Sequence, residues 1–526
     1  MSINSLIQTI PSIDDENKLV SIILQISKMN CNIKDKKYAI ESITNKWYYM
    51  KNKTARQLAT IIYNYSKLKL TSDLLYQLLD DIQCCYKEFN PQGIANIMYA
   101  FGKLNRKPTG DVYDCLMTAI CINHEKFNPQ GIANIMYAFG LLDIKPNGDV
   151  YDCLMKAIRI NHEKFNPQEI ANIMYAFGKL NIKPTGDVYD CLIKAICNNH
   201  KEFNPHNIAN IMYAFGLLDI KPTGDVYDCL MTAICINHEK FNPQGIANIM
   251  YAFGKLNIKP TGDVYDCLIK AICNNHKEFN PQNIANIMYA FGLLDIKPTG
   301  DVYGCLMKAI RINHKKFNPQ EIANIMYAFG LLDIEPTGDV YDCLMKAIRN
   351  NHKEFNPQDI ANIMYAFGLL DIKPTGDVYD CLMKAIRNNH EEFNTIEKQQ
   401  ILQCKYLFDL DIDDLKINQI IKPTESNLQI EIFNRIQQLY PEYVVEKEYL
   451  LLNKLHSCDI YIHGINLVIE IDGPTHYDEN NIKNVRTRLR DNIYTRNSIK
   501  FVSIPYYEWN NLSSVEQEIY LKSKVA

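Results

Sequence analysis

Four polar side chains near the C-terminal end of this 526-residue chain have types and spacings that suit phosphodiester chemistry. Asp459 lies in C-D-I-Y-I, and Glu470, Asp472 and His476 lie in V-I-E-I-D-G-P-T-H-Y. Residues two apart in a strand point to the same side, so Glu470 and Asp472 are expected to share one face. Carboxylate oxygens suit Mg²⁺, which can activate water for hydrolysis. The pattern predicts a catalytic site with Asp459 and Glu470 as metal ligands; a polar cluster that holds the G-P-T-H turn is the alternative.

The surrounding sequence provides strands and helices that could bring these residues together. A capped amphipathic helix, carrying a further candidate acid at Glu431, is predicted for S-N-L-Q-I-E-I-F-N-R-I-Q-Q-L. Strand patterns occur in Y-V-V-E-K-E-Y-L-L, C-D-I-Y-I-H-G, N-L-V-I-E-I-D-G and I-K-F-V-S-I-P. A charged helix with Arg486, Arg488 and Arg490 precedes the last strand, and another helix closes the chain. We therefore expect an α/β domain over residues 426–526, after a linker at 415–425.

The sequence ahead of this domain consists mainly of eight near-identical copies of a 38-residue segment, which together span residues 89–392. In the first copy Asn90 is a good helix N-cap and Pro91 suits the first helical position. This first helix of each copy, helix A, ends at K-P-T-G, and an apolar stripe predicts a second helix, helix B. The period predicts an all-α superhelical solenoid of αα-hairpins. We expect a helical N-terminal region at 1–52, a degenerate copy at 53–88 and a half-copy cap at 393–414.

Helix A has three faces, and the third combines polar side chains with an aromatic ring. One face is apolar, and a second is a narrow strip of small residues where a neighbouring helix could approach. The third face carries Gly93, Asn96, Tyr99 and Lys103. An aromatic ring for stacking, an amide and a cation on one surface are typical of proteins that bind single-stranded RNA.

The copies differ at a few positions only, and the fifth is restricted to Gly, Asn, Asp and Glu. Proteins that read RNA by repeats use two or three side chains for each base. We therefore predict that this position contacts bases, although drift of exposed positions is the alternative. Its residues are Gly93, Gly131, Glu169, Asn207, Gly245, Asn283, Glu321 and Asp359.

The fifteenth position alternates between Lys and Leu, and every Lys occurs with Asn at the seventeenth position, every Leu with Asp. We expect phosphate contacts from Lys103, Lys179 and Lys255, and from lysines that recur on helix B. The helix B lysines are Lys156, Lys194, Lys270, Lys308, Lys346 and Lys384.

The overall charge does not mark a nucleic-acid binder, since the formal net charge is -4 and the pI is about 6.3. The copy at residues 317–354 has six acids against three basic residues, which favours the alternative that the array holds a protein. The recurring cysteines are expected to be reduced, buried packing residues. They are not expected to bind zinc, because four copies have Arg in place of the second Cys. No signal peptide, transit peptide or membrane span is visible, so we expect a cytoplasmic protein; secretion into a host cell and organelle import stay open.

The segment from about Ser426 to Leu521 resembles a RAP domain. The resemblance rests on the helix with Glu431, on Asp459 in C-D-I-Y-I, on I-E-I-D-G-P-T-H-Y, on the Arg-rich helix and on I-P-Y-Y-E-W. This domain is similar in turn to restriction-endonuclease-like folds, whose core is a mixed sheet flanked by helices. The copies resemble octotricopeptide repeats, which have two helices and commonly precede a RAP domain. The resemblance implies a sequence-selective single-stranded RNA-binding protein that acts in RNA stability, processing or translation. A Mg²⁺-dependent nuclease positioned by the repeats and a protein-binding scaffold or secreted effector are the alternatives.

Overall fold

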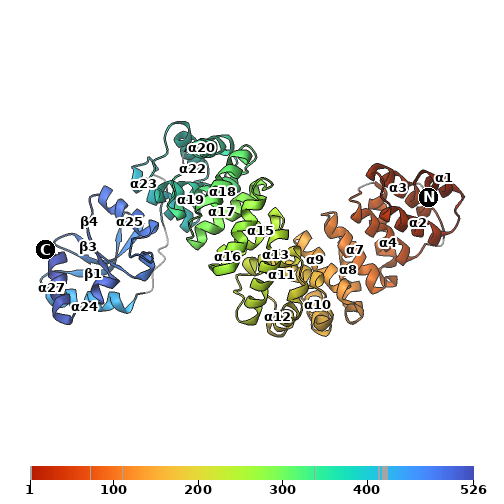
Figure 1. Cartoon of the computed structure of the whole chain (residues 1–526), viewed down its shortest axis with the longest axis horizontal. Coiled ribbons are helices and arrows are strands. Elements are labelled where there is room, and N and C mark those ends of the chain that lie inside the picture. The colour runs from red at the N-terminus through yellow and green to blue at the C-terminus, as the bar shows by residue number, and fades with distance from the viewer. Residues whose placement is uncertain are drawn as a thin grey trace. The chain divides into compact units, whose positions relative to one another are not determined.

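The computed structural model describes residues 3–51, 53–70, 73–108, 110–336, 338–412, 415–417 and 425–525. They form two compact units, Met1–Ala271 and Ile272–Ala526, with the boundary inside helix α16 (Gly262–Asn275). Figure 1 shows the order of the elements along the chain. Most of the predicted linker lies outside the described residues. In the described parts, no helix has the length and apolar character needed to span a membrane.

The predicted two-helix repeats are confirmed, and a helical region with α1 (Ile3–Thr9), α2 (Glu16–Lys28) and α3 (Ile33–Tyr48) precedes them. Helices A are α4 (Ala55–Lys67), α7 (Pro91–Lys103), α9 (Pro129–Leu142), α11 (Pro167–Leu180), α13 (Pro205–Leu218), α15 (Pro243–Leu256), α17 (Pro281–Leu294), α19 (Pro319–Leu332), α21 (Pro357–Leu369) and α23 (Thr395–Phe408). Helices B are α8 (Gly110–Asn123), α10 (Gly148–Asn161), α12 (Gly186–Asn199), α14 (Asp225–Asn237), α16, α18 (Gly300–Asn313), α20 (Asp339–Asn351) and α22 (Gly376–Asn388). In the degenerate copy, two short helices, α5 (Asp73–Asp80) and α6 (Ile82–Cys85), follow α4.

Both ends of helix A follow from its sequence. An Asn caps the start and Pro fills the first position, as at Asn128 and Pro129. Many of these helices end on a residue with positive φ, such as Asp143 at 51° and Asn181 at 49°. Asn and Asp adopt this left-handed backbone more readily than other side chains. The restriction of the seventeenth position to Asn and Asp is therefore explained by helix termination.

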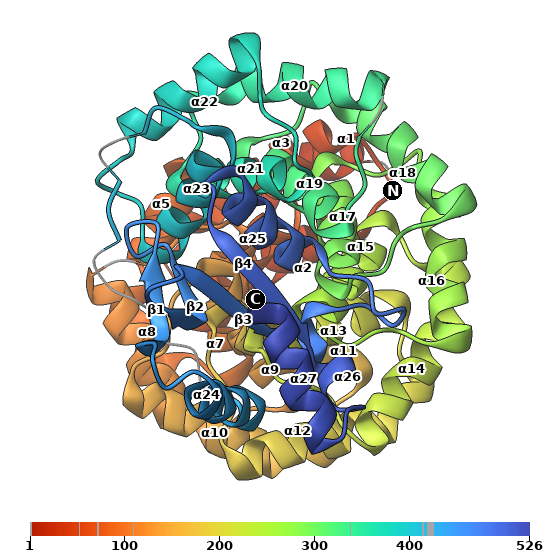
Figure 2. The ribbon, with the colours of Figure 1, turned by 90° about the vertical axis from the view of Figure 1, so that its left-hand side faces the viewer.

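Helices A pack closely through the predicted strip of small residues. A Cβ added to Gly178 would lie 2.8 Å from the Cα of Ala214 on the next helix A, so only glycine fits there. Inside each unit Figure 2 shows helices A within a layer of helices B: α7, α9, α11 and α13 inside α8, α10, α12 and α14, and likewise α17, α19 and α21 inside α18, α20 and α22. The polar third face of helix A therefore belongs to the inner layer.

The recurring cysteines of helix B are half-buried, so the prediction that they are buried packing residues is wrong. Their positions lie where consecutive helices B meet. Cys121 forms a thiol hydrogen bond with Cys153 of the next copy, whereas Arg159, at the position equivalent to Cys121, pairs with Asp187. The exchange of Cys for Arg thus replaces one contact between copies by another. Among the described residues, no group of three or more His, Cys, Asp or Glu side chains is arranged so that it could hold a metal ion.

The C-terminal part of the second unit is the predicted α/β domain. Its sheet has the order β1 (Val445–Leu451), β2 (His456–Ile462), β3 (Leu467–Asp472) and β4 (Lys500–Pro505). The first three strands are antiparallel, and β3 and β4 are parallel, with Ile469 opposite Val502. The mixed sheet expected from the resemblance is confirmed.

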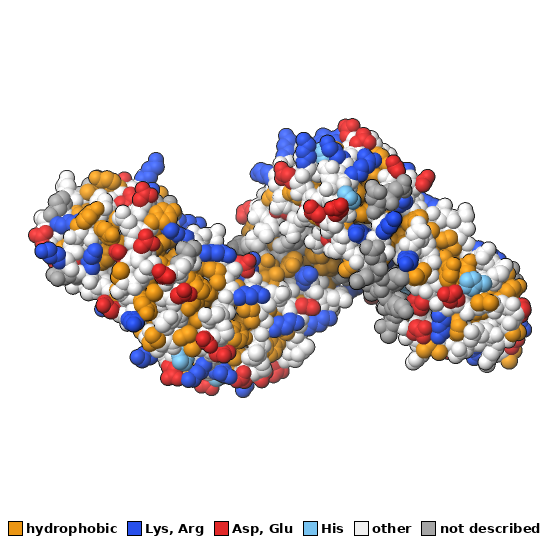
Figure 3. Space-filling view, turned by 180° about the vertical axis from the view of Figure 1, so that it is seen from behind, with side chains coloured by type: hydrophobic (Ala, Val, Ile, Leu, Met, Phe, Trp, Pro, Cys, Tyr) orange, Lys and Arg blue, Asp and Glu red, His pale blue; other side chains and the backbone are white. Residues whose placement is uncertain are grey.

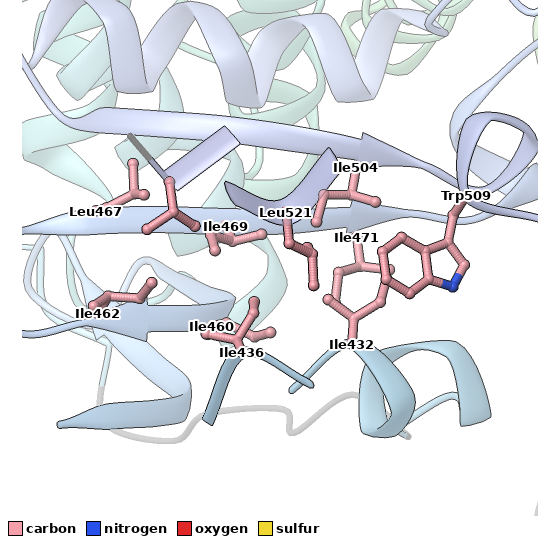
Figure 4. Packing of buried hydrophobic residues seen from close by; sticks show 11 residues of the cluster. Ile432, Ile436, Ile460, Ile462, Leu467, Ile469, Ile471, Ile504, Trp509 and Leu521 are labelled. Carbon is pink, nitrogen blue, oxygen red and sulfur yellow. The ribbon is translucent and has the colours of Figure 1, made fainter. Parts of the chain in front are cut away.

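Helices cover both faces of this sheet. On one face Ile432 of α24 (Asn427–Leu439) and Leu521 of α27 (Ser514–Val525) pack against Ile469 and Ile471, next to Trp509 of the short helix α26 (Tyr506–Trp509) (Figure 4). On the other face α25 (Val485–Arg496) packs Tyr494 against Val468 and Cys458. Side chains alternate along β3, so Glu470 and Asp472 point toward α25.

Candidate functional site

The two acids of β3 meet a cation from α25. The guanidinium of Arg490 lies 3.2 Å from Glu470 and 2.9 Å from Asp472, and it also contacts Asp491 at 2.8 Å. Lys483 lies 3.3 Å from Asp472 and 2.6 Å from Asp491. The prediction that Glu470 and Asp472 share a face is confirmed, but these acids are partners in a buried ion network.

Burial and the neighbouring charges move the pKa values of these acids apart. Burial raises the pKa of Glu470 to about 8 although Arg490 lies beside it, and Tyr494 donates a hydrogen bond to it at 2.7 Å. Burial acts in the same direction on Asp472, but Arg490 and Lys483 outweigh it and hold the pKa of Asp472 below its usual value. Burial also raises the pKa of Asp459 to about 6.

The donor set does not fit the Mg²⁺ ion that a restriction-endonuclease-like domain implies. Asp459 accepts hydrogen bonds from Gln429 and from the backbone of Ile471, both at 2.6 Å. The carboxylates of Glu470 and Asp472 are paired with Arg490, whose side chain is 12% exposed. Of the two predicted metal ligands, Asp459 is engaged by Gln429 and Ile471, and a metal ion at Glu470 would have to displace the buried guanidinium of Arg490. The geometry therefore supports a structural role for the cluster.

The remaining predicted residues of this cluster are only partly brought together. His476 lies 3.5 Å from Asp472 and 3.1 Å from the hydroxyl of Thr487. Glu431 lies elsewhere, in an exposed pair with Arg435, and Gln429 on the same helix reaches Asp459 instead. Gln429, Lys483 and Asp491 also belong to this cluster; their contacts join distant segments and follow no local sequence pattern that would predict them.

The raised pKa of Glu470 predicts a stability that depends on pH. A carboxyl whose pKa is higher in the folded state favours folding fully below its unfolded value, here 4.5, and this contribution is lost as pH rises through about 8. From pH 6.5 to 8, above the ordinary histidine pKa, we expect the C-terminal domain to lose stability, whereas Glu470→Gln removes most of this loss. Denaturant unfolding followed by the fluorescence of Trp509, in a Trp47→Phe background, measures both slopes. Equal slopes would show that Glu470 is ionised in the folded protein.

The fifth-position side chains do not project from the third face of helix A, contrary to the prediction. They stand at the third helical residue, where Glu169, Asn207, Asn283, Glu321 and Asp359 accept a hydrogen bond from the backbone of the capping Asn. Asn207 and Asn283 are 1% exposed. These reciprocal bonds form a capping box, which satisfies backbone donors at the helix start. The choice among Asn, Asp and Glu is therefore explained by capping.

The other predicted residues of the third face remain accessible in the inner layer. Neighbouring tyrosine rings pack in tilted contacts, with centroids 5.7 Å apart for Tyr63 and Tyr99 and 5.5 Å for Tyr137 and Tyr175. The exposed ammonium of Lys103 lies between two such pairs, 5.5 Å from the ring of Tyr99 and 5.2 Å from that of Tyr137. Together with half-buried Asn96, these side chains give the inner face amides, ring edges and cations.

In the second unit the arginine helix α25 covers part of this inner face (Figure 2). Arg488 pairs with Asp333 at 2.6 Å and Arg496 pairs with Asp371 at 2.7 Å. Leu331 and Leu369 are buried there, whereas the equivalent Leu141 and Leu217 are half-buried. Leu at the fifteenth position and Asp at the seventeenth thus form the surface on which α25 packs.

This packing changes the interpretation of the three arginines predicted to bind RNA. Arg490 is buried in the acid cluster, and Arg488 is paired with Asp333. Arg486 is exposed and lies near buried Tyr365. Burial raises the pKa of Tyr365, and the positive charge of Arg486 opposes this rise. Only Arg486 of the three is placed to meet a ligand.

Three of the six acids of the copy at 317–354 contact other groups of the chain. Glu321 caps its helix, Asp333 binds Arg488, and Asp339 lies 3.9 Å from Arg311. Contacts within the chain therefore account for part of the excess of acids in this copy.

A second basic surface lies on helices B of the second unit. Lys315, Lys346 and Arg349 surround one hollow there, with Asp377 at its edge. Lys308 and Lys384 are also exposed on α18 and α22. Figure 3 shows Lys and Arg side chains gathered along the upper edge, where α20 and α22 lie. Helices B therefore present cations of their own.

Comparison with known proteins gives two family matches that cover most of the chain. A family model described as RNA-editing substrate-binding complex 6 protein matches residues 7–221 and again 124–375. A model of the RAP domain matches residues 469–524, which confirms that resemblance. A model described as a protein of unknown function matches residues 379–397. No curated protein matches the chain significantly.

Two solved structures with similarity to this chain have low TM-scores. One belongs to a homology model of the full-length AP-3 complex in an intermediate open conformation; it is 11% identical, covers 84% of this chain and 82% of that chain, and has a TM-score of 0.28. The other is an engineered protein that is 14% identical, covers 70% of this chain and 98% of that chain, and has a TM-score of 0.18.

Proposed function

The chain belongs to the family described as RNA-editing substrate-binding complex 6 protein and ends in a RAP domain, and from this we propose that it binds single-stranded RNA. The inner face of helices A is the proposed contact surface, with Asn96, Tyr99 and Lys103 and their equivalents in the later copies. From the name of the family we further propose that the protein acts in RNA processing together with other proteins. The family match to the repeats is the observation that carries the proposal.

The chemistry of the inner face supports this choice of ligand. Amide side chains both donate and accept hydrogen bonds, as the edges of unpaired bases do. Aromatic rings add stacking surface, and lysines add attraction for phosphates. Burial lowers the pKa of Lys103, and Lys69 adds to this effect. A nearby phosphate would relieve that repulsion.

The RAP domain has a positioning role in this proposal. Its helix α25 occupies the inner face at α19 and α21, through Arg488 and Arg496. RNA that follows the inner face of this unit would meet the RAP domain there, beside exposed Arg486. Specificity is proposed to come from the copies and not from the fifth-position side chains, which cap their helices.

Lys103→Gln, Lys179→Gln and Lys255→Gln combined are expected to weaken RNA binding and its salt dependence. Each phosphate contact on a single strand contributes about 0.7 to the slope of log affinity against log salt, so losing three lowers the slope by about 2. Fluorescence anisotropy of a labelled single-stranded RNA at several salt concentrations measures this change.

The matched control replaces three lysines of helices B in the same unit. Lys156→Gln, Lys194→Gln and Lys270→Gln combined alter the net charge equally, on the outer layer. We expect a slope close to that of the unmodified protein. A larger loss from these three than from the helix A lysines would move the phosphate contacts to helices B.

A further inference from the structure

The first two full copies enclose a polar pocket together with the degenerate copy before them. Its volume is about 290 Å³, and it is lined by side chains of α4, α7 and α9 and by Leu24 of α2. Small-molecule pockets in proteins begin at about 300 Å³, so the space suits one small planar group. Gly93 and Gly131 occupy the fifth position in these two copies and line the pocket.

Glycine at the fifth position keeps this pocket open. A Cβ at Gly93 would lie 3.3 Å from Asn90 Oδ1, and one at Gly131 would lie 3.1 Å from Asn128 Oδ1. A longer side chain would therefore run beside the capping Asn, as Asn207 does. Asn207 also donates a hydrogen bond to Gln168 of the preceding copy at 3.2 Å. A fifth-position amide thus bridges two copies at the place where glycine leaves a space.

Four side-chain amides around the pocket have no hydrogen-bond partner among the described residues: Gln92, Asn96, Gln130 and Asn134. In the next three copies the equivalent amides are paired: Gln168 donates to Asn172 at 2.9 Å, Asn210 contacts His206 at 3.3 Å, and Gln244 donates to Asn248 at 2.8 Å. Unpaired amides that converge on one space are available to a ligand with both donors and acceptors.

The other residues that line the pocket indicate which kind of ligand it can bind. Arg56 is exposed at the pocket and supplies a cation, and the ring of Tyr63 supplies an aromatic wall. None of the residues that line the pocket is acidic. The edge of an unpaired nucleobase can form hydrogen bonds with the amides, and its face can stack on the tyrosine ring. The phosphate of the same nucleotide can pair with Arg56.

We propose that this pocket holds one unpaired base of single-stranded RNA, an inference that rests on the proposed function. Glycine at the fifth position of the first two full copies leaves room for the base, whereas in a copy with Asn there the capping side chain fills the equivalent space. The fifth position then acts on binding by leaving room, without touching the RNA.

The test is the double variant Gly93→Asn and Gly131→Asn in the full-length chain. It introduces the residue that the fourth and sixth copies carry, so a capping box like that of Asn207 can form. We expect about tenfold weaker binding of a single-stranded RNA by fluorescence anisotropy, which corresponds to the loss of one good base contact. In the unmodified protein, RNA that carries 4-thiouridine should cross-link to peptides around residues 90–96 and 128–134, and these cross-links should disappear in the variant.

Two controls separate the possible outcomes. Gly304→Asn makes the same change on a helix B with open space around it and should leave binding unchanged. Arg56→Gln keeps both glycines and should also weaken binding, which covers the case that the double variant fails to fold. Unchanged affinity of both pocket variants, with cross-links elsewhere, would overturn the pocket and leave RNA binding intact. If the unmodified protein binds no RNA, the proposed function fails, and the pocket inference fails with it.

Discussion

Replacing Arg490 with Met is expected to destabilise the C-terminal domain by about 3–5 kcal/mol, because the buried carboxylate of Asp472 loses this cation and Asp491 and Glu470 lose a hydrogen-bond donor. Arg490 is 2.9 Å from Asp472 and 3.2 Å from Glu470, and the side chains of both acids are at most 5% exposed. Lys483 still reaches Asp472 and Asp491, but among the described residues Glu470 has no other ion pair. Denaturant unfolding followed by Trp509 fluorescence, with Trp47 replaced by Phe, measures the loss.

The matched control is Arg488→Met on the same helix. Arg488 is 39% exposed, and its ion pair with Asp333 is a surface pair worth at most about 1 kcal/mol. Adding Glu470→Gln to Arg490→Met should change the stability little at pH 7, since Glu470, whose pKa burial raises to about 8, carries no charge there to be left unpaired. A cost for Arg490→Met no larger than that for Arg488→Met would contradict the account of a buried ion network.

Gly178→Ala is expected to destabilise the repeats of the first unit by about 1–3 kcal/mol, through overpacking between two helices A. The new Cβ would lie 2.8 Å from the Cα of Ala214, which is backbone and cannot rotate away. The two helices would have to separate, and each copy is held mainly by its neighbours. Thermal unfolding followed by circular dichroism at a helix wavelength measures the effect.

Gly304→Ala is the control for this change. Gly304 lies inside α18, where a Cβ meets nothing within 4 Å. Alanine is the better helix former, so this variant should gain up to about 1 kcal/mol. If both variants shift the unfolding temperature in the same direction, close approach of helices A does not explain the recurring glycine.

Much of the fold could be predicted because one 38-residue sequence pattern occurs eight times in the chain. Eight copies of one pattern of caps, apolar positions and small residues specify stacked helical hairpins, and the alternating segments near Glu470 specify strands. The termination of helix A at Asn or Asp could also have been predicted, since these residues tolerate positive φ.

The orientation of the fifth-position side chains was predicted wrongly, although the capping-box spacing can be seen in the sequence. Asn166 followed three residues later by Glu169 is a capping-box pattern, and it indicates a side chain that turns back to the helix start. A helical wheel places that residue on the polar face but does not show where its side chain bonds. A side chain that forms a hydrogen bond with the start of its own helix does not project from the helix surface. This rule would have corrected the prediction.

The role of Arg490 and the packing of α25 on the repeats could not be predicted. Arg490 is eighteen residues from Asp472 in sequence, and its pairing with β3 depends on the fold of the whole domain. The contacts of Arg488 and Arg496 with Asp333 and Asp371 join segments more than a hundred residues apart. Such contacts leave no periodic signal in a single sequence.

Binding of single-stranded RNA by the full-length protein is the measurement that tests the central claim most directly. Fluorescence anisotropy with one labelled RNA, free and annealed to its complement, compares the two forms at low and at physiological salt. We predict saturable binding of the single strand that weakens as salt rises, and weaker binding of the duplex, in which the base edges are paired. No binding of the single strand at low salt and micromolar protein, or equal binding of both forms, would contradict the account.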